Sequence, residues 1–115
     1  MRERGTDMTE ISALLQALEA GKLDQTLSTL SCRGEAGLPA ARARVAALTE
    51  GYRKAFGKGE EAQAAILSAP GRTEICGNHT DHQRGRVLAA AVNLDFLACA
   101  APNGTNTIRF QSEGW

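Results

Sequence analysis

Residues 69–88 read APGRTEICGNHTDHQRGRVL, and this stretch decides how the rest of the chain is interpreted. It combines a proline and three glycines with histidine, aspartate, asparagine and arginine side chains. Apolar runs that are typical of strands lie on both sides of it. Because loops held by a rigid scaffold often carry function, such a variety of hydrogen-bonding groups predicts more than a connection. We expect a pocket for a small polyhydroxylated ligand.

The polar side chains of the stretch suit the recognition of hydroxyl groups. The carboxylate of Asp81 can accept hydrogen bonds from two adjacent hydroxyls, and Asn78 and His79 add further donors and acceptors. Arg72 carries a permanent charge and five donors, which suit a phosphate or a developing negative charge. The residues therefore predict a polar small-molecule site with one cation beside it, and a loop shaped only by its turns is the structural alternative.

A metal site is a second alternative for the same stretch. Cys76, His79 and His82 follow one another at equal spacing. A zinc site usually takes four ligands in two pairs, and the sequence offers one cluster. We therefore favour the ligand pocket for His79 and no metal role for Cys76 or His82. Arg84 and Arg86 are interpreted as a solvated turn rather than an anion-binding patch.

The chain before this stretch has helical patterning. A first helix is expected to start at a capping box of Asp7 and Glu10 and to stop at Gly21. Its apolar face repeats at helical spacing through Ile11, Leu14, Leu15 and Leu18. A short second helix carries Leu23, Leu27 and Leu30, and residues 31–37 are expected to form a loop.

A third helix is expected from Pro39 to Gly57, because proline favours the first turn of a helix and glycine its end. Its core stripe consists of Ala41, Val45, Leu48, Tyr52 and Phe56. Its basic residues are interpreted as an exposed charged face, not a nucleic-acid surface; they include Arg42, Arg44, Arg53 and Lys54.

The second half of the chain has the patterning of strands. Residues 65–69 predict a strand that bends at Pro70-Gly71, and the run 87–92 could be helix or strand. Residues 94–101 and 107–111 flank Asn103-Gly104, a strong hairpin signal. We therefore predict a helical segment at 1–60 and a β-rich segment at 61–115. The expected fold class is α+β, with N-terminal helices packed on an incomplete, mostly antiparallel sheet.

Composition limits the remaining possibilities. The 115 residues correspond to one domain or part of one. The 13 basic and 13 acidic residues balance, so no net field favours nucleic acid or a membrane surface. Neither a membrane-spanning run nor a signal peptide is recognisable, so we expect a cytoplasmic protein. Cys32, Cys76 and Cys99 are widely spaced and odd in number, which predicts reduced thiols.

The stretch from residue 70 closely resembles the sugar-binding signature of galactokinases, members of the galactokinase, homoserine kinase and mevalonate kinase superfamily. That signature has a pattern close to PGRxNxIGEHTDYxxGxVLP. The sequence aligns with this pattern without insertion or deletion. The matching positions are Pro70, Gly71, Arg72, Gly77, His79, Thr80, Asp81, Gly85, Val87 and Leu88. The resemblance extends from residue 70 to the end of the chain, including the strands and turn that follow the signature.

The resemblance implies a role for each matching polar residue. Asp81 would bind adjacent hydroxyls of galactose or a related hexose, and His79 would line the same pocket. Arg72 would be catalytic, close to the C1 hydroxyl and the transferred phosphoryl group. Asn78 would also contact the sugar, although the family usually has glutamate there, and His82 replaces a usual tyrosine.

The resemblance also implies what is missing from these 115 residues. The family's glycine- and serine-rich ATP loop, its catalytic aspartate and its C-terminal lobe have no counterpart in the sequence. ATP and Mg²⁺ are therefore expected for the complete family enzyme and not for this chain alone. We expect a piece of a galactokinase-like enzyme or a truncated gene product, inactive by itself. The alternative is a non-catalytic sugar-sensing or protein-interaction module, and an uncovered sheet edge predicts self-association.

Overall fold

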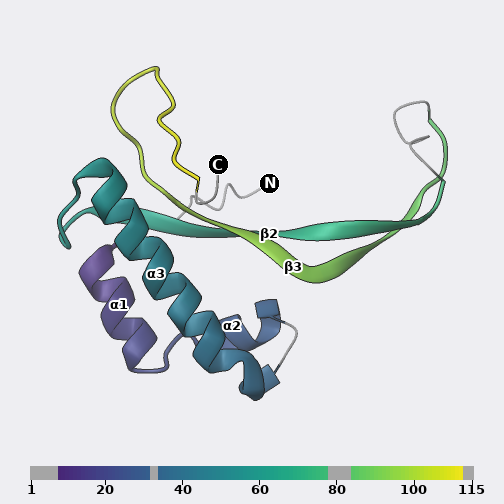
Figure 1. Cartoon of the computed structure of the whole chain (residues 1–115), viewed down its shortest axis with the longest axis horizontal. Coiled ribbons are helices and arrows are strands. Elements are labelled where there is room, and N and C mark those ends of the chain that lie inside the picture. The colour runs from purple at the N-terminus through teal and green to yellow at the C-terminus, as the bar shows by residue number, and fades with distance from the viewer. Residues whose placement is uncertain (1–7, 32–33, 78–83, 113–115) are drawn as a thin grey trace, which may run out of the picture.

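The computed structural model describes residues 8–31, 34–77 and 84–112, and it has an α+β architecture. Its elements are β1 (Thr9–Glu10), α1 (Ile11–Glu19), α2 (Asp24–Ser31), the 3₁₀ helix η1 (Gly34–Gly37), α3 (Leu38–Phe56), β2 (Gln63–Cys76) and β3 (Leu88–Ala100). The three strands form an antiparallel sheet in the order β1-β2-β3. The helices lie on one side of the long β2–β3 ribbon (Figure 1). The predicted fold class is confirmed, while the division at residue 60 stays a prediction.

The start of α1 differs from the prediction. Residues 9 and 10 belong to β1, which pairs with β2, and the helix begins at Ile11. Glu10 occupies the N-cap position without a side-chain cap bond, so the predicted capping box with Asp7 is wrong. Asp7 itself lies outside the described residues. The backbone N–H of Ile11 instead donates to the carbonyl of Ala62 at 3.0 Å. A tertiary contact therefore satisfies a donor that has no partner within the helix.

The helix ends follow the predicted glycines. Gly21 has a φ of +72°, and the N–H of Lys22 donates back to the carbonyl of Ala17 at 3.0 Å. This bond pattern ends a helix when a residue adopts the left-handed conformation, which glycine reaches without steric cost. α3 ends in the same way at Gly57. The predicted loop at 31–37 is partly helical, because it contains η1.

The stripe of α3 forms the middle of a small core. Val45 is buried and the rings of Tyr52 and Phe56 lie 5.3 Å apart, as expected for the predicted stripe. Thr49 is also fully buried, and its hydroxyl donates to the carbonyl of Val45 at 2.5 Å. The other buried residues come from α1 and β2: Ile11, Leu18, Ala64 and Ala65. The core therefore lies where α1, α3 and the first part of β2 meet.

The sequence suggested a strand that bends at Pro70-Gly71, but β2 runs through these two residues. The strand continues to Cys76, and the ladder with β3 shifts register between Pro70 and Arg72. Proline lacks a backbone N–H, so an irregularity in the ladder is a position where a strand tolerates it. A Cβ on Gly71 would lie 3.1 Å from Cγ2 of Val92, so the close approach expected at this glycine is made by β3.

β3 joins two predicted strands into one, and the hairpin expected after it is wrong. Residues 107–111 form no strand. The side chain of Asn103 accepts a hydrogen bond from the N–H of Thr105 at 2.9 Å and donates to the carbonyl of Thr107 at 2.8 Å. These bonds complete a local turn, and they use backbone groups that a returning strand would need.

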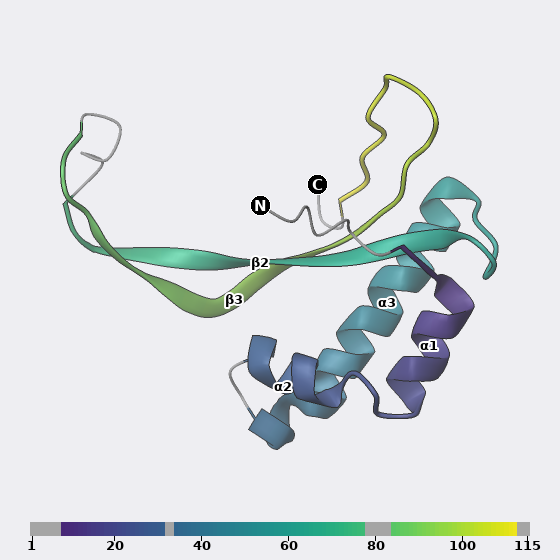
Figure 2. The same cartoon turned by 180° about the vertical axis from the view of Figure 1, so that it is seen from behind.

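The β2–β3 ribbon extends well beyond the helices in both views (Figures 1 and 2). The helices therefore support one half of the ribbon only. In the other half, residues 71–76 and 84–91 are exposed. Cys76 and Leu88, which flank the segment with the polar signature, pair at this far end.

Candidate functional site

The signature residues lie in the segment 77–87 that connects β2 to β3, which is called the signature turn. Asn78, His79 and Asp81, together with His82, lie outside the described residues. Their positions relative to one another and to Arg72 therefore stay predictions. The ribbon brings residues 76 and 88 into register, so the turn is closed at its base by a strand pair.

Of the four predicted site residues, Arg72, Asn78, His79 and Asp81, Arg72 lies within the described residues. It lies on β2 opposite Ala91, immediately after the register shift, and its side chain is exposed. The next rungs pair Thr73 with Ala90 and Glu74 with Ala89, so small alanines line β3 across from it. Within residues 8–31, 34–77 and 84–112, the Arg72 guanidinium makes no hydrogen bond or ion pair. The five donors of a guanidinium suit an anionic ligand.

The base of the turn requires glycine at position 77. Gly77 has a φ of +111°, a conformation that side chains with a Cβ rarely adopt. A Cβ there would lie 2.5 Å from the carbonyl oxygen of Arg86 and 2.7 Å from a methyl carbon of Val87. On the other side of the turn, Arg84 adopts a left-handed φ of +62°. Positive φ angles therefore occur on both sides of residues 78–83.

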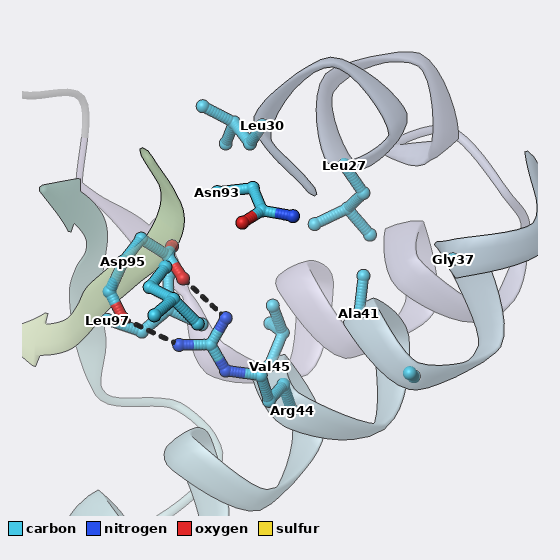
Figure 3. A pocket seen from close by; sticks show the side chains of 11 residues that line it. Leu27, Leu30, Gly37, Ala41, Arg44, Val45, Asn93, Asp95 and Leu97 are labelled. Atoms are coloured by element: carbon cyan, nitrogen blue, oxygen red, sulfur yellow. Dashed lines mark hydrogen bonds and ion pairs between the residues drawn. The ribbon is translucent and has the colours of Figure 1, made fainter. Parts of the chain in front are cut away.

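A second feature lies near the middle of the ribbon, and sequence reasoning missed it. A cavity of about 290 Å³ separates α2 and α3 from β3 (Figure 3). Its walls are mainly apolar, and Asn93, Arg44 and Asp95 supply its polar edge. Leu27 and Leu30, predicted as the apolar side of α2, face it from the helical side (Figure 3).

Asp95 lies at the centre of the hydrogen bonds at this cavity. Its carboxylate accepts hydrogen bonds from the hydroxyl of Ser68 at 2.7 Å and from Nη1 of Arg44 at 2.5 Å. The Ser68 bond first, and then the Arg44 guanidinium, lower the pKa of Asp95 below its usual value. Because Arg44 and Asp95 neutralise each other, the cavity offers no free charge to a ligand. The signal in the sequence was a lone aspartate in the apolar run 88–100.

The basic face predicted for α3 is engaged in ion pairs. Arg42 binds Asp24 of α2, with Nε 2.8 Å from Oδ1, and Arg44 binds Asp95. Arg53 contacts two glutamates at 3.1 and 3.2 Å. Each of these arginines therefore has a carboxylate partner within the protein.

The thiols and possible metal ligands give no further site. Cys76 is exposed and Cys99 is half-buried, both are free, and burial raises the pKa of Cys99. No cluster of three metal-binding side chains occurs within residues 8–31, 34–77 and 84–112, which do not include His79 and His82. Of the helices that the structure describes, none has both the length and the apolar character needed to cross a membrane.

Comparison with known proteins assigns the region around the turn. The galactokinase galactose-binding signature matches residues 50–102. A galactokinase of Lacticaseibacillus casei is 35% identical over 65 residues, which are 56% of this chain and 16% of that protein. A galactokinase of Streptococcus mutans is 37% identical over 65 residues, and one of Ligilactobacillus salivarius is 39% identical over 54 residues. No solved structure shows a significant match.

These matches cover only a small part of each relative. The aligned region spans 16% of the casei and mutans proteins and 14% of the salivarius protein. The signature match at residues 50–102 contains the end of α3, all of β2 and β3, and the segment between them. Residues 50–102 thus carry the galactose-binding signature of the galactokinases, and the chain is galactokinase-like over this region.

Proposed function

We propose that the turn at the end of the β2–β3 ribbon binds the hydroxyl groups of galactose. The observation that supports this most directly is the match of the galactose-binding signature to residues 50–102, a range that contains the complete turn. The identities at Arg72, His79 and Asp81 fall on the polar residues whose chemistry suits a sugar. The exposure of residues 71–76 and 84–91, which flank the signature residues 78–83, leaves room for a ligand beside the ribbon.

Each proposed contact follows from the chemistry of its side chain. Asp81 accepts hydrogen bonds from two neighbouring sugar hydroxyls, and His79 adds a donor or acceptor beside it. Asn78 replaces the glutamate that is usual in the resembling signature, so it offers one acceptor oxygen and no charge. A site built on such groups discriminates sharply between sugars, because an unmatched buried hydrogen-bonding partner is costly.

We propose that Arg72 acts on the phosphoryl group and not on the sugar ring. In a complete galactokinase-like enzyme, ATP with Mg²⁺ would supply the phosphoryl group that forms a bond to the C1 oxygen of galactose. The exposed guanidinium of Arg72, with no partner in the part of the chain that is described, can stabilise negative charge at that position. The 115 residues contain no glycine- and serine-rich phosphate loop, so we propose that this chain alone binds galactose without transferring phosphate.

Calorimetry with galactose and galactose 1-phosphate separates these roles. The unchanged protein should release heat with both ligands, and Asp81→Ala should abolish binding of both. Arg72→Ala should leave galactose binding unchanged and remove any added affinity for the phosphate ester. Arg86→Ala is the matched control, since it removes an exposed arginine that has no proposed ligand contact. Absence of heat with either ligand, or equal binding by Asp81→Ala, would contradict the proposal.

The proposed lack of phosphoryl transfer has its own test. The purified protein with galactose, ATP and Mg²⁺ should form no galactose 1-phosphate. Product formation that Asp81→Ala abolishes would show that the chain is an enzyme by itself.

A non-catalytic module for sugar sensing or protein interaction is the second candidate. The exposure of apolar side chains on the sheet, including Phe96 at 66%, favours an interaction role. This candidate becomes the better one if galactose does not bind while the protein still associates. The predicted cytoplasmic location stays a prediction.

A further inference from the structure

Among residues 8–31, 34–77 and 84–112, no helix packs on one face of the sheet, and this face is apolar. Leu67 lies opposite Ala98, and Ala69 lies opposite Phe96. Residues that face each other across a ladder point to the same side of a sheet, so these four side chains share one face. Phe96 is 66% exposed and Leu67 is 47% exposed. We call this set of four residues the apolar face.

The helices lie against the opposite face. The neighbouring rungs pair Ser68 with Leu97 and Pro70 with Asp95. Asp95 is bound to Arg44 of α3, so its side of the sheet is the one that the helices cover. Side chains alternate along a strand, so the apolar face points away from the helices. Both views show the helices on a single side of the ribbon (Figures 1 and 2).

The molecule exposes more surface than a compact monomer does. Its accessible surface is 9280 Å², whereas a monomer of its mass typically exposes about 6,100 Å². Its radius of gyration is 16.9 Å, against about 13 Å for a compact domain of this length. A standard protein interface needs only about 800 Å² from each partner. The surface of the whole chain thus exceeds that of a compact monomer by about 3,200 Å², more than one partner contributes to a standard interface.

We propose that the apolar face binds the same face of a second copy of this chain, around a two-fold axis. A two-fold contact places one patch against itself, which requires a patch without like charges. The apolar face contains no charged residue, and the formal net charge of the chain is zero. Neither local nor overall repulsion opposes the approach of two copies. The proposal does not depend on galactose binding.

Light scattering coupled to size-exclusion chromatography, without sugar, tests the contact. Across a concentration series, the unchanged protein should reach the mass of a dimer. Leu67→Lys combined with Phe96→Lys places charges on the two-fold contact. It should raise the dissociation constant by at least roughly 30-fold, the size expected when a central interface residue is lost.

Two further variants keep the result specific. Leu30→Lys is the matched control, because Leu30 is 49% exposed on α2, on the helical side of the sheet. It should leave the dimer intact. Phe96→Ser is a milder change for the case that the double variant unfolds, and far-ultraviolet circular dichroism should show an unchanged fold.

Two outcomes would overturn the proposal. The first is a monomer throughout the concentration series of the unchanged protein. The second is a folded Phe96→Ser or double variant that dimerises as tightly as the unchanged protein, which would assign the contact to the free edge of β3 instead.

Discussion

Asp95 connects β3 to helix α3, and removal of its carboxylate tests how strongly the ribbon is anchored to the helices. The carboxylate binds the hydroxyl of Ser68 at 2.7 Å and Nη1 of Arg44 at 2.5 Å. Nη2 of Arg44 also donates to the backbone carbonyl of Asp95 at 3.1 Å. The Asp95 side chain is 16% exposed, whereas that of Arg44 is 54% exposed.

We expect Asp95→Ala to lower the free energy of unfolding by about 2–3 kcal/mol. A hydrogen bond to a charged group contributes about 1.5–3 kcal/mol. The ion pair with the half-exposed Arg44 adds less than about 1 kcal/mol, because water screens it. Arg44 remains in contact with water after the change, so the variant leaves no buried charge without a partner. Most of the loss should therefore come from the bond to Ser68.

Urea unfolding followed by far-ultraviolet circular dichroism measures this loss. Asp24→Ala is the matched control, because the Asp24 side chain is 31% exposed against 16% for Asp95, and it binds Arg42 without a serine hydroxyl. The control should cost clearly less than Asp95→Ala. The reasoning is refuted if the two variants lose equal stability, or if Asp95→Ala unfolds at the same urea concentration as the unchanged protein.

Three further predictions concern the same fold. Because the Ser68 hydroxyl lowers the folded-state pKa of Asp95, its contribution is complete above the unfolded-state value of about 3.9 and disappears as pH falls through the lowered value. The stability difference between the unchanged protein and Asp95→Asn should shrink accordingly in acid. Gly77→Ala should cost at least about 2 kcal/mol in urea unfolding, since it adds left-handed strain to a steric clash; a neutral result would contradict the turn geometry. In single-cysteine variants, half-buried Cys99 should react with a thiol reagent more slowly than exposed Cys76, and equal rates would exclude this difference in burial.

Local signals predicted the helices well because a few neighbouring residues determine them. Gly21 and Gly57 end helices where expected, since left-handed backbone conformations favour glycine wherever the chain lies. The predicted start of α1 was wrong because residues 9 and 10 form a strand that pairs with the first part of β2, which is distant in sequence. Patterns within a short window contain no information about such a partner.

The errors in the second half have a similar cause. Asn103-Gly104 forms a turn, but the turn is completed by side-chain bonds and not by a returning strand. Pro70-Gly71 is a turn signal, but in the structure these residues lie at a register shift within the long β2–β3 ladder.

The candidate site was accessible to sequence reasoning because its polar residues occur at fixed spacing around one turn, and the match over residues 50–102 bears out that resemblance. The placement of Arg72 on an exposed strand could not be predicted, since it depends on β2 continuing beyond Pro70. The bond between Arg44 and Asp95 was also missed, because it joins residues from different halves of the chain.

The register of the sheet has a consequence for the order of folding. The pair of Cys76 and Leu88, next to the signature turn, joins the residues closest in sequence, whereas Thr9 and Ala64 join the most distant. Because closing a longer loop costs more entropy, we expect the ribbon to zip from the turn toward the helices and β1 to pair last. The end that carries the signature would then also be the place where assembly of the sheet begins.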